Sequence, residues 1–159
     1  FNLEKSYFRL DFMFQEDDGN DEVEDFNDWN GAYSLVTKWE NNAWYFWTDL
    51  SFADRKDGDV WGIQLMPFYD ITDKTQVIFC YTHLESSGDD QLRASRWEDR
   101  LDRGAYRGDD LTEYFFGLNH FFYGHKLKWQ NGLQYTELEQ DGTKEYEGWG
   151  FTTAFRISW

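Results

Sequence analysis

The sequence predicts an all-β protein, an antiparallel up-and-down transmembrane β-barrel with eight strands in its 159 residues. Three observations lead to this prediction. Runs of about ten residues alternate between apolar and polar side chains along the whole chain, as strands with two different faces do. Aromatic residues make up 21 % of the chain and hydrophobic residues 40 %, so ordinary aliphatic core-formers are scarce. Tight turns and longer polar loops separate the runs in alternation, which is the layout of a transmembrane barrel.

The first four strands are expected at Lys5–Gln15, Gly31–Glu40, Ala43–Ala53 and Val60–Tyr69. Successive side chains of a strand point to opposite faces, so residues of one parity share a face. The apolar faces carry, in order, Phe8, Leu10 and Phe12; Tyr33, Leu35 and Trp39; Trp44, Phe46 and Leu50; and Trp61, Ile63 and Leu65.

The second four strands are expected at Thr75–Leu84, Thr112–Tyr123, His125–Glu137 and Phe151–Trp159. Their apolar faces carry, in order, Val77, Phe79 and Tyr81; Phe116, Leu118 and Phe122; Leu127, Trp129 and Leu133; and Phe151, Phe155 and Ile157. The last strand keeps this alternation to the end of the sequence, so Trp159 is expected at the edge of a lipid bilayer.

The connections are expected to differ between the two ends of the barrel. Tight turns are predicted at Glu40–Ala43, Asp70–Lys74 and Tyr123–His125. Longer polar loops are predicted between the first and second, third and fourth, fifth and sixth, and seventh and eighth strands. The longest of these is expected at Glu85–Asp110.

The charged residues indicate which face meets water. The polar faces of the strands carry Gly, Ser, Thr, Gln and Asn together with charges of both signs, and burying such charges costs several kcal/mol each. A water-filled interior is therefore expected, and a soluble lipocalin-like barrel is the competing interpretation. The residues expected to line the interior are Arg9, Asp11, Lys38, Asp49, Lys126, Lys128 and Arg156.

Composition excludes several other classes. The formal net charge is −16, which disfavours a nucleic-acid partner because phosphate backbones attract basic surfaces. The sequence contains no run of 18 apolar residues, so no transmembrane helix is predicted. Cys80 is the single cysteine, so no internal disulfide or Cys/His zinc site is expected, and we expect no cofactor.

The region Trp97–Trp159 carries more specific motifs. These are Gly117-Leu118-Asn119 within an aromatic run, Gly124-His125-Lys126-Leu127-Lys128, Gln134-Tyr135-Thr136, and the aromatic terminus. Together they resemble the C-terminal portion of the phosphate-selective porin O/P family. The aromatic last residue also resembles the signal by which outer-membrane assembly machinery recognises its clients.

The resemblance implies a bacterial outer-membrane location and a sixteen-stranded, usually trimeric barrel with a basic constriction. The present sequence would then be the C-terminal half of such a barrel. A complete eight-stranded barrel is the alternative, since its side chains would nearly fill it. Bulky residues of the polar faces fit that alternative: Tyr7, Tyr45, Trp47, Phe115 and Phe121.

The longest loop contains five arginines, three or four residues apart. Helical spacing would place their guanidinium groups on one face, where they could attract phosphate or carboxylate. They are Arg93, Arg96, Arg100, Arg103 and Arg107. Asp and Glu side chains lie between them, so local ion pairs are the competing expectation.

The loop Glu16–Asn30 holds eight carboxylates in fifteen residues. It does not match the EF-hand spacing, so a solvated acidic loop is expected rather than a Ca²⁺ site. Divalent ions could still bridge such a loop to lipopolysaccharide. The three histidines, His83, His120 and His125, suggest no catalytic grouping, and no enzyme is expected.

These observations predict one domain, residues 1–159, that acts as an outer-membrane porin of a Gram-negative bacterium. It would let small hydrophilic solutes or ions diffuse passively, with anions such as phosphate among them. The acidic composition departs from the family's basic pattern, so a weakly selective or cation-preferring pore is equally compatible. Outer-membrane lipid and lipopolysaccharide are the expected partners, with a homotrimer if the chain is a porin. The alternative is a small closed barrel that serves as an anchor or adhesion surface through its acidic loops.

Overall fold

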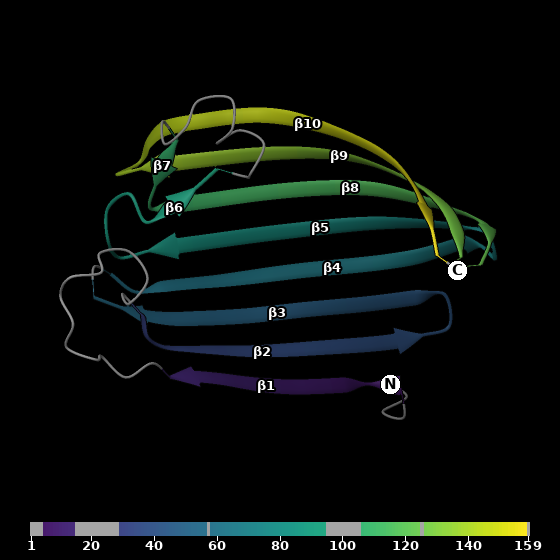
Figure 1. Ribbon diagram of the computed structural model, residues 1–159, viewed down its shortest axis with the longest axis horizontal. Coiled ribbons are helices and arrows are strands. Elements are labelled where there is room, and N and C mark those ends of the chain that lie inside the picture. Colours follow the sequence, from purple (N-terminus) through teal and green to yellow (C-terminus); the bar gives the residue numbers. More distant parts are fainter. Residues whose placement is uncertain (1–4, 15–28, 57, 95–105, 125, 159) are drawn as a thin grey trace.

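Eight long antiparallel strands dominate the computed structural model (Figure 1). It describes residues 5–14, 29–56, 58–94, 106–124 and 126–158. The long strands are β1 (Tyr7–Phe14), β2 (Trp29–Asn41), β3 (Trp44–Arg55), β4 (Val60–Thr72), β5 (Thr75–Ser86), β8 (Asp110–Tyr123), β9 (Leu127–Gln140) and β10 (Thr143–Ile157). Two short strands, β6 (Leu92–Arg93) and β7 (Arg107–Gly108), pair with each other. All eight expected strands are therefore confirmed, most of them one to three residues longer than predicted.

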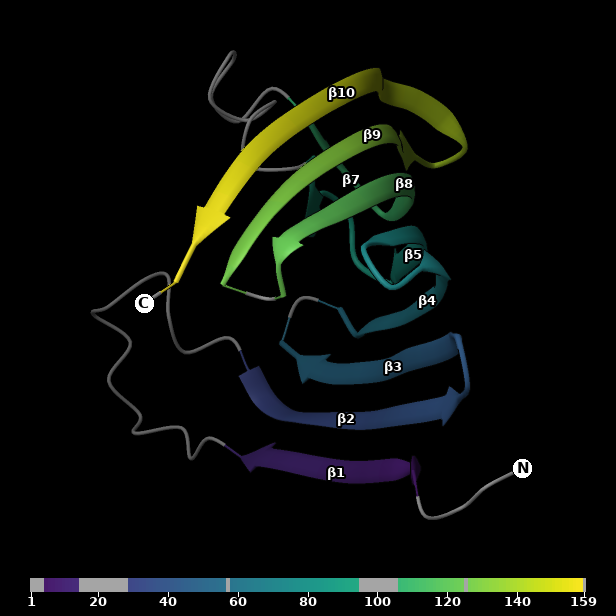
Figure 2. The same ribbon diagram turned by 90° about the vertical axis from the view of Figure 1, so that its right-hand side faces the viewer.

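The long strands form one up-and-down sheet in the order β1-β2-β3-β4-β5-β8-β9-β10. Each strand pairs antiparallel with its neighbour in this order. The sheet bends into an arc that stays open, since β1 and β10 do not pair within the described residues (Figure 2). The all-β, antiparallel, up-and-down prediction is confirmed, while the sheet has two free edges instead of a closed ring.

Tight turns gather at one end of the sheet, which we call the turn end, and the opposite end is the loop end. At the turn end, two or three residues join β2 to β3, β4 to β5 and β8 to β9, as predicted. Asn42 in the first of these turns has φ of 53°, a conformation that Asn adopts more readily than most residues.

Two connections at the loop end are shorter than predicted. Asp141 and Gly142 alone join β9 to β10, with φ of 52° and 71°, as in a two-residue type I′ hairpin turn. Residues 56–59 join β3 to β4. Expecting long loops here was wrong because most residues at these strand ends are polar and the alternation becomes weak, although their backbones continue to pair.

The two faces of the arc differ in exposure. On the convex face, aromatic side chains stand out from the sheet, with exposed fractions of 59 % for Phe12, 69 % for Trp149 and 71 % for Phe151. On the concave face, Asn119 and Thr136 are buried. The buried hydrophobic cluster lies at the loop end, where Leu92 and Ala94 pack against Leu111 and Leu138. Among the described residues, no second layer packs on the apolar convex face of this sheet.

Candidate functional site: the concave face

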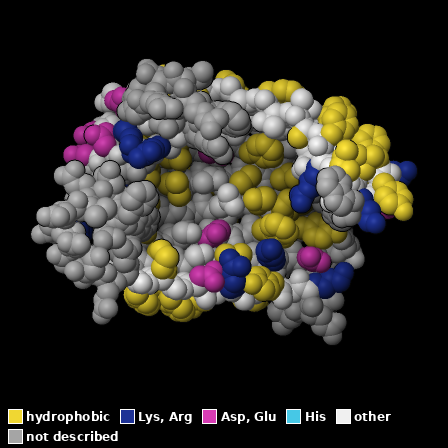
Figure 3. All heavy atoms as spheres, in the orientation of Figure 1, with side chains coloured by type: hydrophobic (Ala, Val, Ile, Leu, Met, Phe, Trp, Pro, Cys, Tyr) yellow, Lys and Arg dark blue, Asp and Glu magenta, His cyan; other side chains and the backbone are white. Residues whose placement is uncertain are grey.

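The concave face collects the charged side chains predicted to line an interior. Strand register brings Arg9 opposite Val36, and Val36 opposite Asp49. Directly opposite residues point to the same side of a sheet, so Arg9 and Asp49 lie on one face. Lys38 pairs with Trp47 on that face, and Lys128 pairs with Arg156. Figure 3 looks into this hollowed face, where basic, acidic and hydrophobic side chains lie side by side. The alternation predicted Lys126 within the strand His125–Glu137, but β9 begins at Leu127 and Lys126 lies in the turn before it.

Most of the charges on β1–β3 are engaged by neighbours. Arg9 Nε lies 2.7 Å from Asp11 Oδ2. Asp49 accepts hydrogen bonds from Ser34 at 3.1 Å and from Ser51 at 2.8 Å. Lys38 Nζ lies 4.0 Å from the centre of the Trp47 ring, a cation–π geometry. Of these contacts only the one between Arg9 and Asp11 pairs opposite charges; the others stabilise a side chain that keeps its charge.

Lys128 and Arg156 form a basic pair at the turn end of β9 and β10. They are directly opposite each other across the two strands. Within the described residues, no carboxylate lies within ion-pair distance of either. Lys128 Nζ instead lies 5.9 Å from the centre of the Phe121 ring. Among the described residues, this part of the concave face therefore presents positive charge without an ion-pair partner, beside the free edge of β10.

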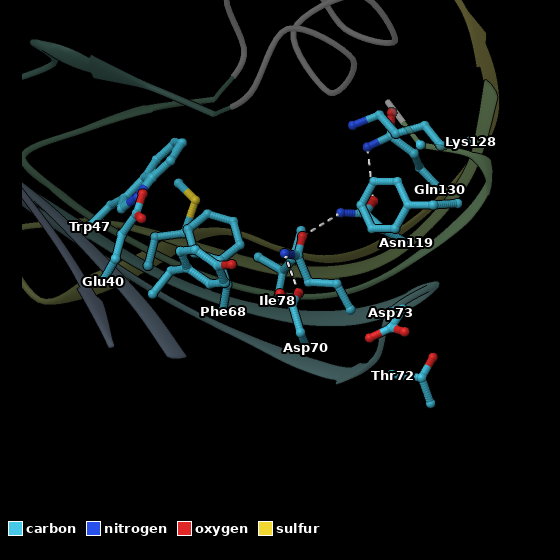
Figure 4. A pocket seen from close by; sticks show the side chains of 15 residues that line it. Glu40, Trp47, Phe68, Asp70, Thr72, Asp73, Ile78, Asn119, Lys128 and Gln130 are labelled. Atoms are coloured by element: carbon cyan, nitrogen blue, oxygen red, sulfur yellow. Dashed lines mark hydrogen bonds between the residues drawn. The ribbon is translucent and has the colours of Figure 1, made fainter. Parts of the chain in front are cut away.

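A row of hydrogen-bonded side chains crosses four strands between β4 and β9. Gln76 Nε2 donates to Asp70 Oδ1 at 2.8 Å, and Asn119 Nδ2 donates to Gln76 Oε1 at 3.0 Å. Gln130 Nε2 in turn donates to Asn119 Oδ1 at 3.0 Å. Figure 4 shows this row, which we call the amide row, along the wall of a hollow of about 620 Å³. The sequence alone did not suggest the row, because its members are far apart in the chain and meet only through strand register.

Apolar side chains also line the concave face, although its parity reads as polar in the sequence. Trp47, Met66, Phe68 and Ile78 border the same hollow as the amide row. Trp47 and Phe68 meet edge to face with ring centres 4.9 Å apart. The bulk of Tyr45 and Trp47 was visible in the sequence, but Phe68 and Ile78 were missed because Pro67 and the short turn obscure the alternation there.

The described ends of the arginine loop fold against the concave face. Arg93 pairs with Arg107 across β6 and β7, so these two positions lie in strands and not on the helical face that their spacing would allow. Leu92 and Ala94 pack there against Leu111 and Leu138 of β8 and β9. Three of the five predicted arginines, Arg96, Arg100 and Arg103, lie outside the described residues, as does most of the acidic loop Glu16–Asn30.

The nucleophilic and imidazole side chains are dispersed. Cys80 is buried on the concave face with its Sγ 3.7 Å from Thr82 Oγ1. His83 Nδ1 lies 3.1 Å from Thr112 Oγ1, and His120 Nδ1 lies 3.2 Å from Thr75 Oγ1, both on the convex face. His125 is outside the described residues. The part of the chain that the structure describes contains no trio of His, Cys, Asp or Glu placed to hold a metal ion.

Comparison with known proteins adds no relative. No family model, no curated protein and no solved structure matches this chain. Among the described residues, no helix has the length and apolar character needed to cross a membrane.

Proposed function

We propose that this chain is the C-terminal half of an outer-membrane porin through which small hydrophilic solutes and ions diffuse passively. The observation that carries the proposal is the convex face, which exposes large apolar side chains on each of the eight long strands. Monomeric soluble proteins rarely expose so continuous an apolar surface, and a lipid bilayer is the medium that would cover it.

Hydrogen bonding on the convex face supports a lipid environment. Trp129 Nε1 donates to Thr153 Oγ1 at 2.9 Å, and the Thr153 hydroxyl donates to Asn131 Oδ1 at 3.0 Å. Trp39 Nε1 donates to Thr37 Oγ1 at 3.0 Å, and that oxygen lies 2.7 Å from Thr48 Oγ1. Polar groups on a lipid-facing surface need such partners because hydrocarbon offers none.

The open arc favours a half-barrel over a complete eight-stranded barrel. The free edges of β1 and β10 each present a row of backbone N–H and C=O groups. In a bilayer each unpaired group costs several kcal/mol, so further strands must cover both edges. The resemblance of Trp97–Trp159 to the phosphate-selective porin O/P family supports the same proposal, with sixteen strands and a trimer.

Charge on the concave face supports a water-filled pore of mixed selectivity. Lys128 and Arg156 would attract anions. Glu40, Asp70 and Asp73 border the same hollow as Lys128 and would oppose a phosphate. The inward-packed β6–β7 hairpin, with Arg93 and Arg107, would narrow the pore at the loop end.

Channel activity in a planar lipid bilayer tests this function. The protein purified from its own membrane is expected to give stable open-channel currents, and the reversal potential under a KCl gradient measures charge selectivity. Absence of current from correctly folded protein would contradict the porin. The small barrel that acts as an anchor or adhesion surface through acidic loops would then become the better proposal.

A further inference from the structure

We propose that the hollow at the turn end of the concave face is a binding site for a neutral, polyhydroxylated solute of the carbohydrate class. The inference names a solute for the proposed channel and therefore rests on that function. The site is built from the amide row Asp70, Gln76, Asn119 and Gln130 and from the rings of Phe68 and Phe121. Its volume of about 620 Å³ lies within the range of about 300–1,000 Å³ that small-molecule sites occupy.

The amide row has a fixed direction. The Asp70 carboxylate can only accept, so Gln76 must turn its NH₂ group toward Asp70 and its oxygen toward Asn119. Gln130 donates to Asn119 by the same logic, which leaves Gln130 Oε1 as the last acceptor. Each carboxamide uses one N–H in the row and keeps a second N–H and a lone pair. A wall that offers donors and acceptors at regular spacing suits hydroxyl groups, because each hydroxyl both donates and accepts.

Aromatic rings flank the amide row on both sides. Phe68 of β4 pairs with Ile78 of β5, two residues along each strand from the pair Asp70 and Gln76. Phe121 of β8 pairs with Lys128 of β9, two residues along each strand from the pair Asn119 and Gln130 and on the opposite side of the amide row. Sugar rings have C–H patches on their faces and hydroxyls around their edges. The C–H patches can pack on phenyl rings while the hydroxyls bond the amides. Figure 4 shows Phe68, Asn119 and Gln130 along the same wall.

The charges around the hollow favour a neutral solute over phosphate. Glu40, Asp70 and Asp73 border it from the β2–β5 side, and Lys128 borders it from β9. To reach the amide row, a phosphate would have to approach three carboxylates. Like charges repel, so this approach is unfavourable. A neutral polyol meets no such repulsion and can use the carboxylates as acceptors for its hydroxyls.

Binding and current block by maltotriose test the inference, with inorganic phosphate and glycine as competing probes. Calorimetry on the folded protein in detergent measures binding whether or not the channel conducts. Maltotriose is expected to bind and to reduce the open-channel current in a saturable way, while phosphate and glycine do not compete. Binding in detergent without any current would contradict the porin and leave the binding site standing. Current without maltotriose binding, or binding of phosphate or glycine instead, would overturn the site.

Neighbouring residues on opposite faces supply the matched variants. Phe121→Ala is expected to weaken maltotriose binding about tenfold, because it removes an aromatic face, whereas Phe122→Ala on the convex face leaves binding unchanged. Asp70→Asn replaces the acceptor-only carboxylate with an amide that can also donate, so the direction of the row is no longer fixed. It is expected to weaken binding about fivefold, with Asp59→Asn in the β3–β4 connection as control. If Phe121→Ala does not fold, Phe121→Leu keeps the apolar bulk and removes only the aromatic ring. Equal effects of the Phe121 and Phe122 substitutions would contradict the proposed site.

Discussion

Gly117 and Gly132 lie opposite each other on β8 and β9, and the ring of Phe115 covers both on the concave face. A Cβ atom at either position would collide with that ring. Glycine is needed at these two positions because the Phe115 ring packs directly on the backbone, not because the backbone angles are unusual. Gly150 on β10 has no such neighbour, since the nearest atom to its Cβ position, Gln134 Cβ, is 3.8 Å away.

Gly132→Ala is expected to destabilise the folded protein by about 1–2 kcal/mol, because the Phe115 ring must leave its place. Gly150→Ala is the control and should leave stability unchanged or slightly raised. Urea unfolding in lipid vesicles measures both variants. Adding Phe115→Ala to Gly132→Ala should remove the collision, and a combined loss equal to the sum of the two single losses would contradict this explanation.

At the same scale, Lys128 and Arg156 supply the positive charge of the turn end, opposite the carboxylates of Glu40, Asp70 and Asp73. Replacing both with Gln is expected to shift the reversal potential toward cations, because no described carboxylate compensates them. Arg9→Gln is the control, since Arg9 is already paired with Asp11 at 2.7 Å and should shift the potential less. A larger shift from Arg9→Gln than from the double substitution would contradict this prediction.

Among the elements, the β6–β7 hairpin is held to the sheet by a small apolar cluster. Leu138 of β9 is fully buried there, against Leu92, Ala94 and Leu111. The strands that supply the cluster come from distant parts of the chain, so it ties the connection between β5 and β8 to the concave face. In the proposed porin, this packing would keep the connection between β5 and β8 inside the pore and so narrow it.

Leu138→Ala is expected to weaken hairpin packing by about 2–5 kcal/mol through the cavity it creates. Limited proteolysis should then cut the connection between β5 and β8 faster, and the open-channel current should rise if the hairpin narrows the pore. Leu133→Ala, on the convex face of the same strand and 44 % exposed, is the control. Unchanged proteolysis in Leu138→Ala would contradict a packed hairpin.

For the whole molecule, the medium around the convex face is the decisive property. Cross-strand aromatic pairs cover this face, such as Trp129 with Phe155 at 6.0 Å and Tyr135 with Trp149 at 4.9 Å between ring centres. Such pairs stabilise the sheet, but they leave the outer sides of the rings uncovered. In the proposed porin, lipid would cover this convex face and water would fill the concave side.

Phe151→Lys is expected to reduce the fraction of protein that folds into lipid vesicles, because a cation on the proposed lipid-facing surface costs up to about 2–4 kcal/mol. Thr152→Lys, the next residue and on the concave face, should fold normally. Heat-dependent mobility in gel electrophoresis measures the folded fraction. Equal folding of the two variants would argue against lipid around the convex face.

The eight strands and their two faces follow from the sequence alone. Alternation with period two is a local property, so Phe8, Leu10 and Phe12 on one face and Arg9 and Asp11 on the other could be assigned without the structure. The same parity rule placed Lys38, Asp49, Lys128 and Arg156 on one surface. The rule failed where strand ends are polar on both faces, as at Gln140 and Thr143, because pairing there continues through the backbone.

Register and curvature belong to the tertiary structure. Asp70, Gln76, Asn119 and Gln130 form one row only because four strands align at these positions, and no local pattern specifies that alignment. The inward packing of Leu92 on Leu138 also depends on contacts between segments far apart in the chain. The sequence by itself determined which side chains share a face. The tertiary structure decided which of them touch and left the sheet open between β1 and β10, because these features depend on pairing across strands.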